Sequence, residues 1–155
     1  MTQQNLEVSI TRYIDAPPAL VWQAMTERFD EWWCPRPWRA KLDAVEWCSG
    51  GRFDTTMFGP EGEKMPFKGL LLEVIPEHRM VFTDAMDRDW NPQAAFMIGI
   101  MELAPEGSGT RYTGRARHWT EEAKQRHLEM GFTDGWMAAS AQLAALVEGG
   151  AGERK

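Results

Sequence analysis

The chain has 155 residues, of which 43% are hydrophobic and 26% charged, and its formal net charge at pH 7 is −6. This length and composition fit one globular domain with a real core, so we assign residues 1–150 to a single domain and 151–155 to a frayed tail. The negative charge argues against nucleic acid and anionic membrane surfaces as partners, and the absence of a long apolar run argues against membrane insertion.

The N-terminal region predicts one strand followed by two helices. Apolar and polar residues alternate over Leu6–Ile14, as in a half-buried strand. Pro17 and Pro18 then favour the first turn of a helix, and we expect Asp15 to accept backbone N–H bonds at its start. A second short helix is predicted over Glu27–Trp33, before a proline-rich break.

The middle of the chain predicts strands separated by turn residues. The expected strands are Lys41–Trp47, Arg52–Phe58, Met65–Ile75, Met80–Thr83, Ala94–Leu103 and Thr110–Trp119. Residues 105–109 read as a hairpin loop between the last two strands. Within the third of these strands, Lys68 and Glu73 differ in parity, so we expect a bulge near Gly69 that curls the sheet.

The C-terminal region predicts one long helix that starts at Thr120 and ends at Gly149-Gly150. Thr120 is a good N-cap, and an apolar face repeats with helical spacing from Leu128 to Val147. Gly131 and Gly135 each cost roughly 1 kcal/mol inside a helix, which predicts a close backbone neighbour or a bend. Strands in the middle and helices at both ends give an α+β fold with an antiparallel sheet.

Two side chains of the last predicted strand are candidates for polar groups in the interior. Tyr112 and His118 share one face of the strand with small residues, whereas the arginines between them occupy the other face. They are either hydrogen-bonded core residues or groups that orient a ligand in an apolar pocket.

Other motifs argue against several classes of site. His118 and His127 lie far in sequence from Cys34 and Cys48, without metal-binding spacing, so we expect no metal and no cofactor. The acidic segment 84–92 lacks the pattern of a calcium loop and reads as a solvated turn. The sequence also has no signal-peptide pattern, which predicts a cytoplasmic location and reduced cysteines.

Aromatic and sulfur-containing side chains are unusually frequent, with eight Trp, ten Met and seven Phe. Such side chains can line a ligand cavity as well as fill a core. Trp32, Trp33 and Trp38 flank the proline-rich break, where they either border the open end of a cavity or pack the short helix onto the sheet.

In combination these segments resemble the START-like helix-grip (SRPBCC) superfamily, in the branch of activator of Hsp90 ATPase homologues. The resemblance rests on seven segments that cover nearly the whole chain: 14–22, 32–33, 50–53, 69–76, 79–83, 109–111 and 135–136. It implies a curved antiparallel sheet that grips the C-terminal helix and leaves a cavity between them. Such folds serve as lipid carriers, polyketide binders, cyclases and co-chaperones, so the fold alone fixes no activity.

We therefore expect a binding protein for a small apolar or amphipathic molecule, with no catalytic motif to carry over. The residues expected to line the cavity are Phe53, Phe67, Phe82, Met97, Tyr112, His118, Phe132 and Trp136, with Trp32, Trp33 and Trp38 at the rim. Two alternatives stay open: a cyclase or dehydratase in which Tyr112 or His118 moves a proton, and a stress-related interaction module with an exposed tryptophan patch. No sequence feature decides whether the chain forms a homodimer.

Overall fold

The sheet forms the main layer of the protein. The computed structural model describes residues 5–148, and within them seven antiparallel strands follow the order β1-β7-β6-β5-β4-β3-β2. Their bounds are β1 Glu7–Ile14, β2 Arg39–Val45, β3 Arg52–Phe58, β4 Lys64–Ile75, β5 Arg79–Thr83, β6 Ile98–Glu106 and β7 Gly109–Arg117.

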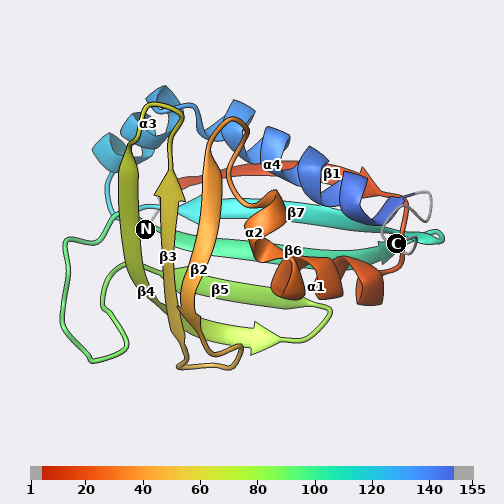
Figure 1. Cartoon of the computed structure of the whole chain (residues 1–155), viewed down its shortest axis with the longest axis horizontal. Coiled ribbons are helices and arrows are strands. Elements are labelled where there is room, and N and C mark those ends of the chain that lie inside the picture. Colours follow the sequence, from red (N-terminus) through yellow and green to blue (C-terminus); the bar gives the residue numbers. More distant parts are fainter. Residues whose placement is uncertain (1–4, 149–155) are drawn as a thin grey trace.

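The helices cover one face of this sheet. They are α1 Pro18–Glu27, α2 Phe29–Trp32, α3 Glu121–Glu129 and α4 Phe132–Val147. Figure 1 shows α4 lying along β1, with α1 and α2 on the same side of the sheet. The predicted α+β helix-grip fold is confirmed. None of the helices in the described range is both long and apolar enough to cross a bilayer.

The sheet is strongly curled, so that β2, β3 and β4 cross the direction of β6 and β7 (Figure 1). One register irregularity between β2 and β3 falls at Asp43, and one between β4 and β5 falls at Leu72. The second lies three residues beyond the bulge predicted near Gly69. Gly69 has another role, because a Cβ there would lie 2.6 Å from the carbonyl oxygen of Thr83. The curl leaves space between this part of the sheet and α4.

The predicted single C-terminal helix is in fact two helices. Thr120 caps α3 as expected, its hydroxyl accepting a hydrogen bond from the Ala123 amide at 3.1 Å. The backbone then breaks at Gly131, whose φ of +93° is left-handed. An apolar repeat that continues across the break cannot reveal it, because the break depends on a dihedral angle that glycine adopts without strain.

Two further predictions about local structure are corrected. Pro17, not Asp15, is the N-cap of α1, and no side chain caps this helix. Strand β6 begins at Ile98 instead of Ala94, because the amides of Phe96 and Met97 donate to the Asp84 carboxylate and not to a strand partner. The strand continues to Glu106, so the following hairpin loop is shorter than predicted.

One half of the interior is closely packed. Here α1 packs against β6 and β7, α4 packs against β1, and α2 lies between α4 and β2. Its fully buried side chains include Ile14, Val21, Met25, Trp32, Tyr112 and Leu143. The indole N–H of Trp32 donates to the Met25 carbonyl at 3.3 Å, so even the largest of these side chains satisfies its polar atom.

Candidate functional site

The other half of the interior is hollow. A cavity of about 490 Å³ lies between the curled part of the sheet and the junction of α3 with α4. Strands β3, β4 and β5 supply one wall, and the end of α3 and the start of α4 supply the opposite wall. The connection between α2 and β2 and the end of the β5–β6 loop complete it. The lining residues from the sheet are Phe53, Thr55, Met57, Met65, Pro66, Phe67 and Phe82.

Aromatic rings make up much of both walls. On the sheet, the ring centroids of Phe53 and Phe82 lie 5.2 Å apart, and Phe67 lies 6.1 Å from each of them. On the helical side, Phe132 and Trp136 of α4 lie 4.6 Å apart. The three rings of the sheet come from the neighbouring strands β3, β4 and β5 and point to the same face of the sheet. Phe132 and Trp136 are four residues apart, so they share a face of α4.

The structure places six of the eight residues expected at the cavity in its lining. These are Phe53, Phe67, Phe82, Met97, Phe132 and Trp136. The remaining two, Tyr112 and His118, do not line it. Both point inward from β7 and its end, as strand parity predicts, but they lie beneath other side chains and not at the cavity wall.

Tyr112 belongs to the packed half of the interior. It is 1% exposed, and its ring centroid lies 6.3 Å from that of Trp32. Burial raises the pKa of its phenol, which keeps the hydroxyl protonated. A proton-transfer role for Tyr112 toward a cavity ligand has no geometric support.

His118 lies behind the cavity wall, and His127 lies on it. The Nδ1 atom of His118 is 3.0 Å from the carbonyl oxygen of Leu6, and its Nε2 atom is 2.9 Å from Nδ1 of His127. His127, on α3, is a lining residue that sequence reasoning did not place there. The sequence did contain a signal: two histidines that lie close together in the chain, one of them on a helix with an apolar face, are candidates for a buried hydrogen-bonded pair.

The three tryptophans near the proline-rich break occupy different environments. Trp33 and Trp38 line the cavity, whereas Trp32 is fully buried in the packed half. Trp33 lies between the two halves, with ring centroids 5.6 Å from Phe29 and 5.5 Å from Trp136. None of the three is among the exposed large side chains, so the exposed tryptophan patch expected of an interaction module is not present at this segment.

Gln142 of α4 fixes the connection that carries these tryptophans. Its side-chain amide donates to the carbonyl oxygens of Trp32 and Cys34, at 2.9 and 3.0 Å. Its carbonyl oxygen accepts from the Arg36 amide at 3.0 Å. One glutamine therefore holds the segment that forms one border of the cavity, a role that no sequence pattern indicates.

Cys34 is a second lining residue that the sequence did not indicate. Its φ is +62°, which is rare for a residue with a side chain, and it is 6% exposed. Burial raises the pKa of its thiol to about 11, with a smaller opposing effect from Arg36. The thiol is therefore protonated at neutral pH and a poor nucleophile.

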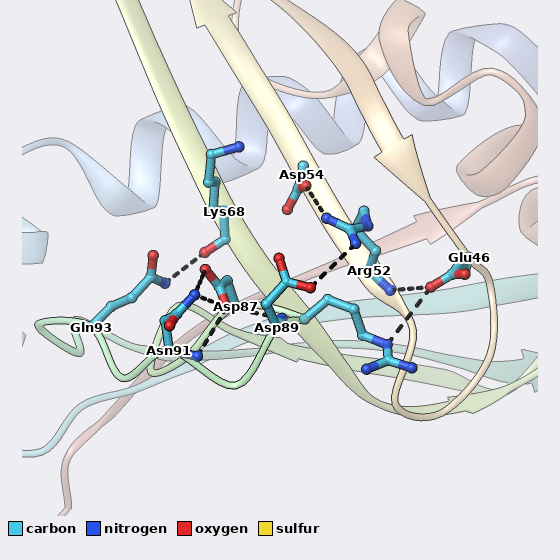
Figure 2. A network of polar contacts seen from close by, with 9 residues as sticks. Glu46, Arg52, Asp54, Lys68, Asp87, Asp89, Asn91 and Gln93 are labelled. Atoms are coloured by element: carbon cyan, nitrogen blue, oxygen red, sulfur yellow. Dashed lines mark hydrogen bonds and ion pairs between the residues drawn. The ribbon is translucent and has the colours of Figure 1, made fainter.

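A polar network holds the β5–β6 loop that borders the cavity (Figure 2). The Gln93 amide donates to the carbonyl oxygens of Lys68 and Asp84, at 2.8 and 2.9 Å. Asp87 accepts from the backbone and side chain of Asn91, which forms the compact turn predicted in place of a calcium loop. No group of three potential metal ligands occurs among residues 5–148.

A second part of the same network ties the loop to β3. Figure 2 shows Arg52 between Asp54 and Asp89. Its guanidinium nitrogens lie 3.4 Å from Oδ2 of Asp54 and 3.8 Å from Oδ1 of Asp89. Asp54 is 6% exposed, whereas Asp89 is on the loop surface. The ion pairs therefore join the loop to a buried carboxylate of β3, a strand that supplies part of one cavity wall.

Comparisons with solved structures identify close structural relatives. A crystal structure from Nitrosomonas europaea is 38% identical, with a TM-score of 0.86 over 91% of this chain and 93% of that chain. A Mycobacterium smegmatis protein is 28% identical, with a TM-score of 0.78 over 93% and 91% of the two chains. A solution structure from Arthrobacter aurescens is 26% identical, with a TM-score of 0.79 over 91% and 85%.

The family assignment rests on a sequence model as well as on these structures. Among proteins with curated descriptions, none matches this chain. Residues 15–148 match the family described as Activator of Hsp90 ATPase homolog 1-like protein. This match spans α1 to α4 and most of the sheet, and it agrees with the resemblance seen in the sequence. The chain therefore belongs to the family of Activator of Hsp90 ATPase homolog 1-like proteins.

Proposed function

We propose that the protein binds a small apolar or amphipathic molecule in the cavity between the curled sheet and the α3–α4 junction. One observation carries this proposal: the cavity of about 490 Å³ is walled mainly by aromatic and Met side chains from both layers. Its volume falls within the range of about 300–1,000 Å³ that ligand pockets occupy. Burying roughly 200 Å² of apolar ligand surface there supplies about 5 kcal/mol before the costs of association.

Family membership and fold support, in general terms, a ligand-binding or a co-chaperone-like module. The cavity favours the first of these. The polar side chains in the lining are few, namely Cys34, Thr55, Asp84 and His127. Such a lining suits a ligand that is apolar over most of its surface and has one or two polar groups. Both cysteines of the chain are free thiols, which agrees with a cytoplasmic setting for this binding protein.

Tryptophan fluorescence provides a direct assay, because Trp33, Trp38 and Trp136 all line the cavity. We expect saturable changes in emission when the protein is titrated with members of a panel of fatty acids, flavonoids and aromatic polyketides. A ligand of suitable size should bind with one-to-one stoichiometry. The absence of a saturable change across the whole panel would overturn the proposal.

A cavity-filling variant shows whether a bound ligand lies at this site. Gly135 lines the cavity from α4, and a Cβ there would meet only Pro35, at 3.8 Å. Gly135→Leu should therefore fold and lose at least 10-fold in affinity, because its side chain takes up ligand volume. Thr133→Leu, at an exposed position of the same helix, is the matched control and should bind as the wild type does. Equal affinity in both variants would place the ligand elsewhere.

A further inference from the structure

His127 carries the hydrogen-bond acceptor that a neutral ligand would meet in the cavity. It projects from α3 into an aromatic surround, with ring centroids 4.8 Å from Phe96 and 4.9 Å from Phe132. It is 7% exposed and lines the cavity, whereas its partner His118 does not. The side of the His127 ring away from His118 therefore faces the cavity.

The hydrogen bonds behind the cavity determine where the protons lie on both rings. A backbone carbonyl can only accept, so Nδ1 of His118 must carry a hydrogen and donate it to Leu6. In a neutral ring the other nitrogen, Nε2, is then an acceptor. Nδ1 of His127 must donate to it across 2.9 Å.

The same logic determines the state of the remaining nitrogen. With its hydrogen on Nδ1, a neutral His127 has an unprotonated Nε2 with a free lone pair. Among the described residues, no hydrogen bond engages this atom. Burial, and secondarily the neighbouring His118, lowers the pKa of His127 to about 4, which agrees with a neutral ring at pH 7.

The other polar side chains of the lining differ from this acceptor. The Oδ1 atom of Asp84 already accepts hydrogen bonds from the amides of Phe96 and Met97, at 2.9 and 3.3 Å. Its Oδ2 atom is a second acceptor, which a substitution of His127 leaves in place, so loss of donor preference in such a variant distinguishes the two. The Cys34 thiol is a weak hydrogen-bonding group. The Thr55 hydroxyl can donate as well as accept, so it does not select for one kind of polar group.

We propose that Nε2 of His127 is the specificity-determining acceptor of the cavity, and that the ligand is a neutral, mostly apolar molecule with a hydroxyl or phenol group that donates to it. This inference rests on the proposed function, since it concerns the polar group of the ligand that the cavity would hold. It adds the class of ligand: an alcohol or phenol is preferred over its methyl ether, which is similar in shape but cannot donate.

A matched pair of probes tests the inference. 2-Naphthol and 2-methoxynaphthalene share an apolar ring system and differ in one donor. At pH 7, we expect the wild type to bind 2-naphthol about 3- to 10-fold more tightly, as one net hydrogen bond implies. His127→Phe keeps an aromatic ring among Phe96 and Phe132 and should bind both probes with no preference for 2-naphthol. His78→Phe, at an exposed histidine, is the control and should keep the wild-type preference.

The outcomes separate this inference from the proposed function. If the wild type binds both probes equally, or if His127→Phe keeps the preference, the acceptor role is wrong while the binding cavity stands. If the wild type binds neither probe, the inference fails, and the wider ligand panel decides whether the proposed function fails with it.

Nitrogen-15 NMR of the histidine side chains tests the proton positions without any ligand or variant. At pH 7 the spectra should show hydrogen on Nδ1 of both His118 and His127, and an unprotonated Nε2 on each. Hydrogen on Nε2 of His127 would overturn the proposal, because that atom would then be a donor.

Discussion

The two halves of the interior have the same kinds of residue but differ in how they are covered. In the packed half, α1 and α2 insert Val21, Met25 and Trp32 against β6 and β7, and these side chains are fully buried. In the hollow half, the covering elements are the α3–α4 junction and the 33–38 connection, and about 490 Å³ is left open. The cavity therefore results from the arrangement of helices over a curled sheet and not from a shortage of large side chains.

Glycines at two places in the fold account for part of this difference. The break at Gly131 separates α3 from α4, so α3 does not extend α4 along the sheet. Across the cavity, Phe82 lies against Gly99 of β6, where a Cβ would fall 2.2 Å from its ring. Gly99 therefore leaves the room that the tip of this ring occupies.

The largest expected effect concerns loss of packing in the filled half. Leu143 is fully buried, so Leu143→Ala should lower the free energy of unfolding by about 2–5 kcal/mol. Met65, at the cavity, is 47% exposed, and Met65→Ala should cost less than about 1 kcal/mol. Urea denaturation of both variants measures the difference. Equal losses would mean that the two regions are packed alike.

A pH dependence of stability examines the hollow half at His127, on the cavity wall. Folding lowers the pKa of His127 from 6.5 to about 4, so the unfolded chain binds a proton that the folded chain does not between these values. Stability is therefore fully present above pH 6.5 and decreases as the pH falls toward 4, by up to roughly 3 kcal/mol.

His127→Phe removes this contribution, and it also removes the hydrogen-bond partner of His118, so the comparison reports on the histidine pair. Denaturation curves between pH 4 and pH 7.5 should show a shallower loss of stability in the variant. His78→Phe should keep the wild-type slope. If both variants follow the wild type, His127 does not carry the depressed pKa.

The smallest predicted effects have opposite signs at two glycines of the same region. Gly131→Ala should destabilise the protein by about 1 kcal/mol, because its φ of +93° is unfavourable for a residue with a side chain. Gly135→Ala, inside α4 with space beside it, should stabilise the protein by up to about 1 kcal/mol. Thermal unfolding of the two variants measures both changes. Stabilisation by Gly131→Ala would show that the break between the helices is not needed for the fold.

Much of the sheet could be predicted from the sequence, since alternation is a local property. The strand predicted over Arg52–Phe58 has the same bounds as β3 in the structure. The inward direction of Tyr112 follows from the alternation of side chains along β7. The family resemblance, which the family match over residues 15–148 supports, indicated a curved sheet packed against the C-terminal helix. These features depend on near neighbours in the chain or on many weak signals read together.

The parts of the site that the sequence missed depend on where separate elements meet. Trp32 and Trp33 are adjacent in sequence, yet only Trp33 reaches the cavity, because α2 turns the two rings to different sides. His118 points inward as predicted, but the direction of α3 places His127 between it and the cavity. Gln142 acts through backbone atoms about 110 residues away in the chain.

Cys34 has a consequence for the chemistry of anything held beside it. With a thiol pKa of about 11, only about one molecule in ten thousand carries the thiolate at pH 7. An electrophilic guest such as an enone or aldehyde would therefore leave unmodified, and mild oxidants would react slowly with this sulfur. The wall of the cavity is therefore chemically unreactive at this position, as the reversible binding proposed above requires.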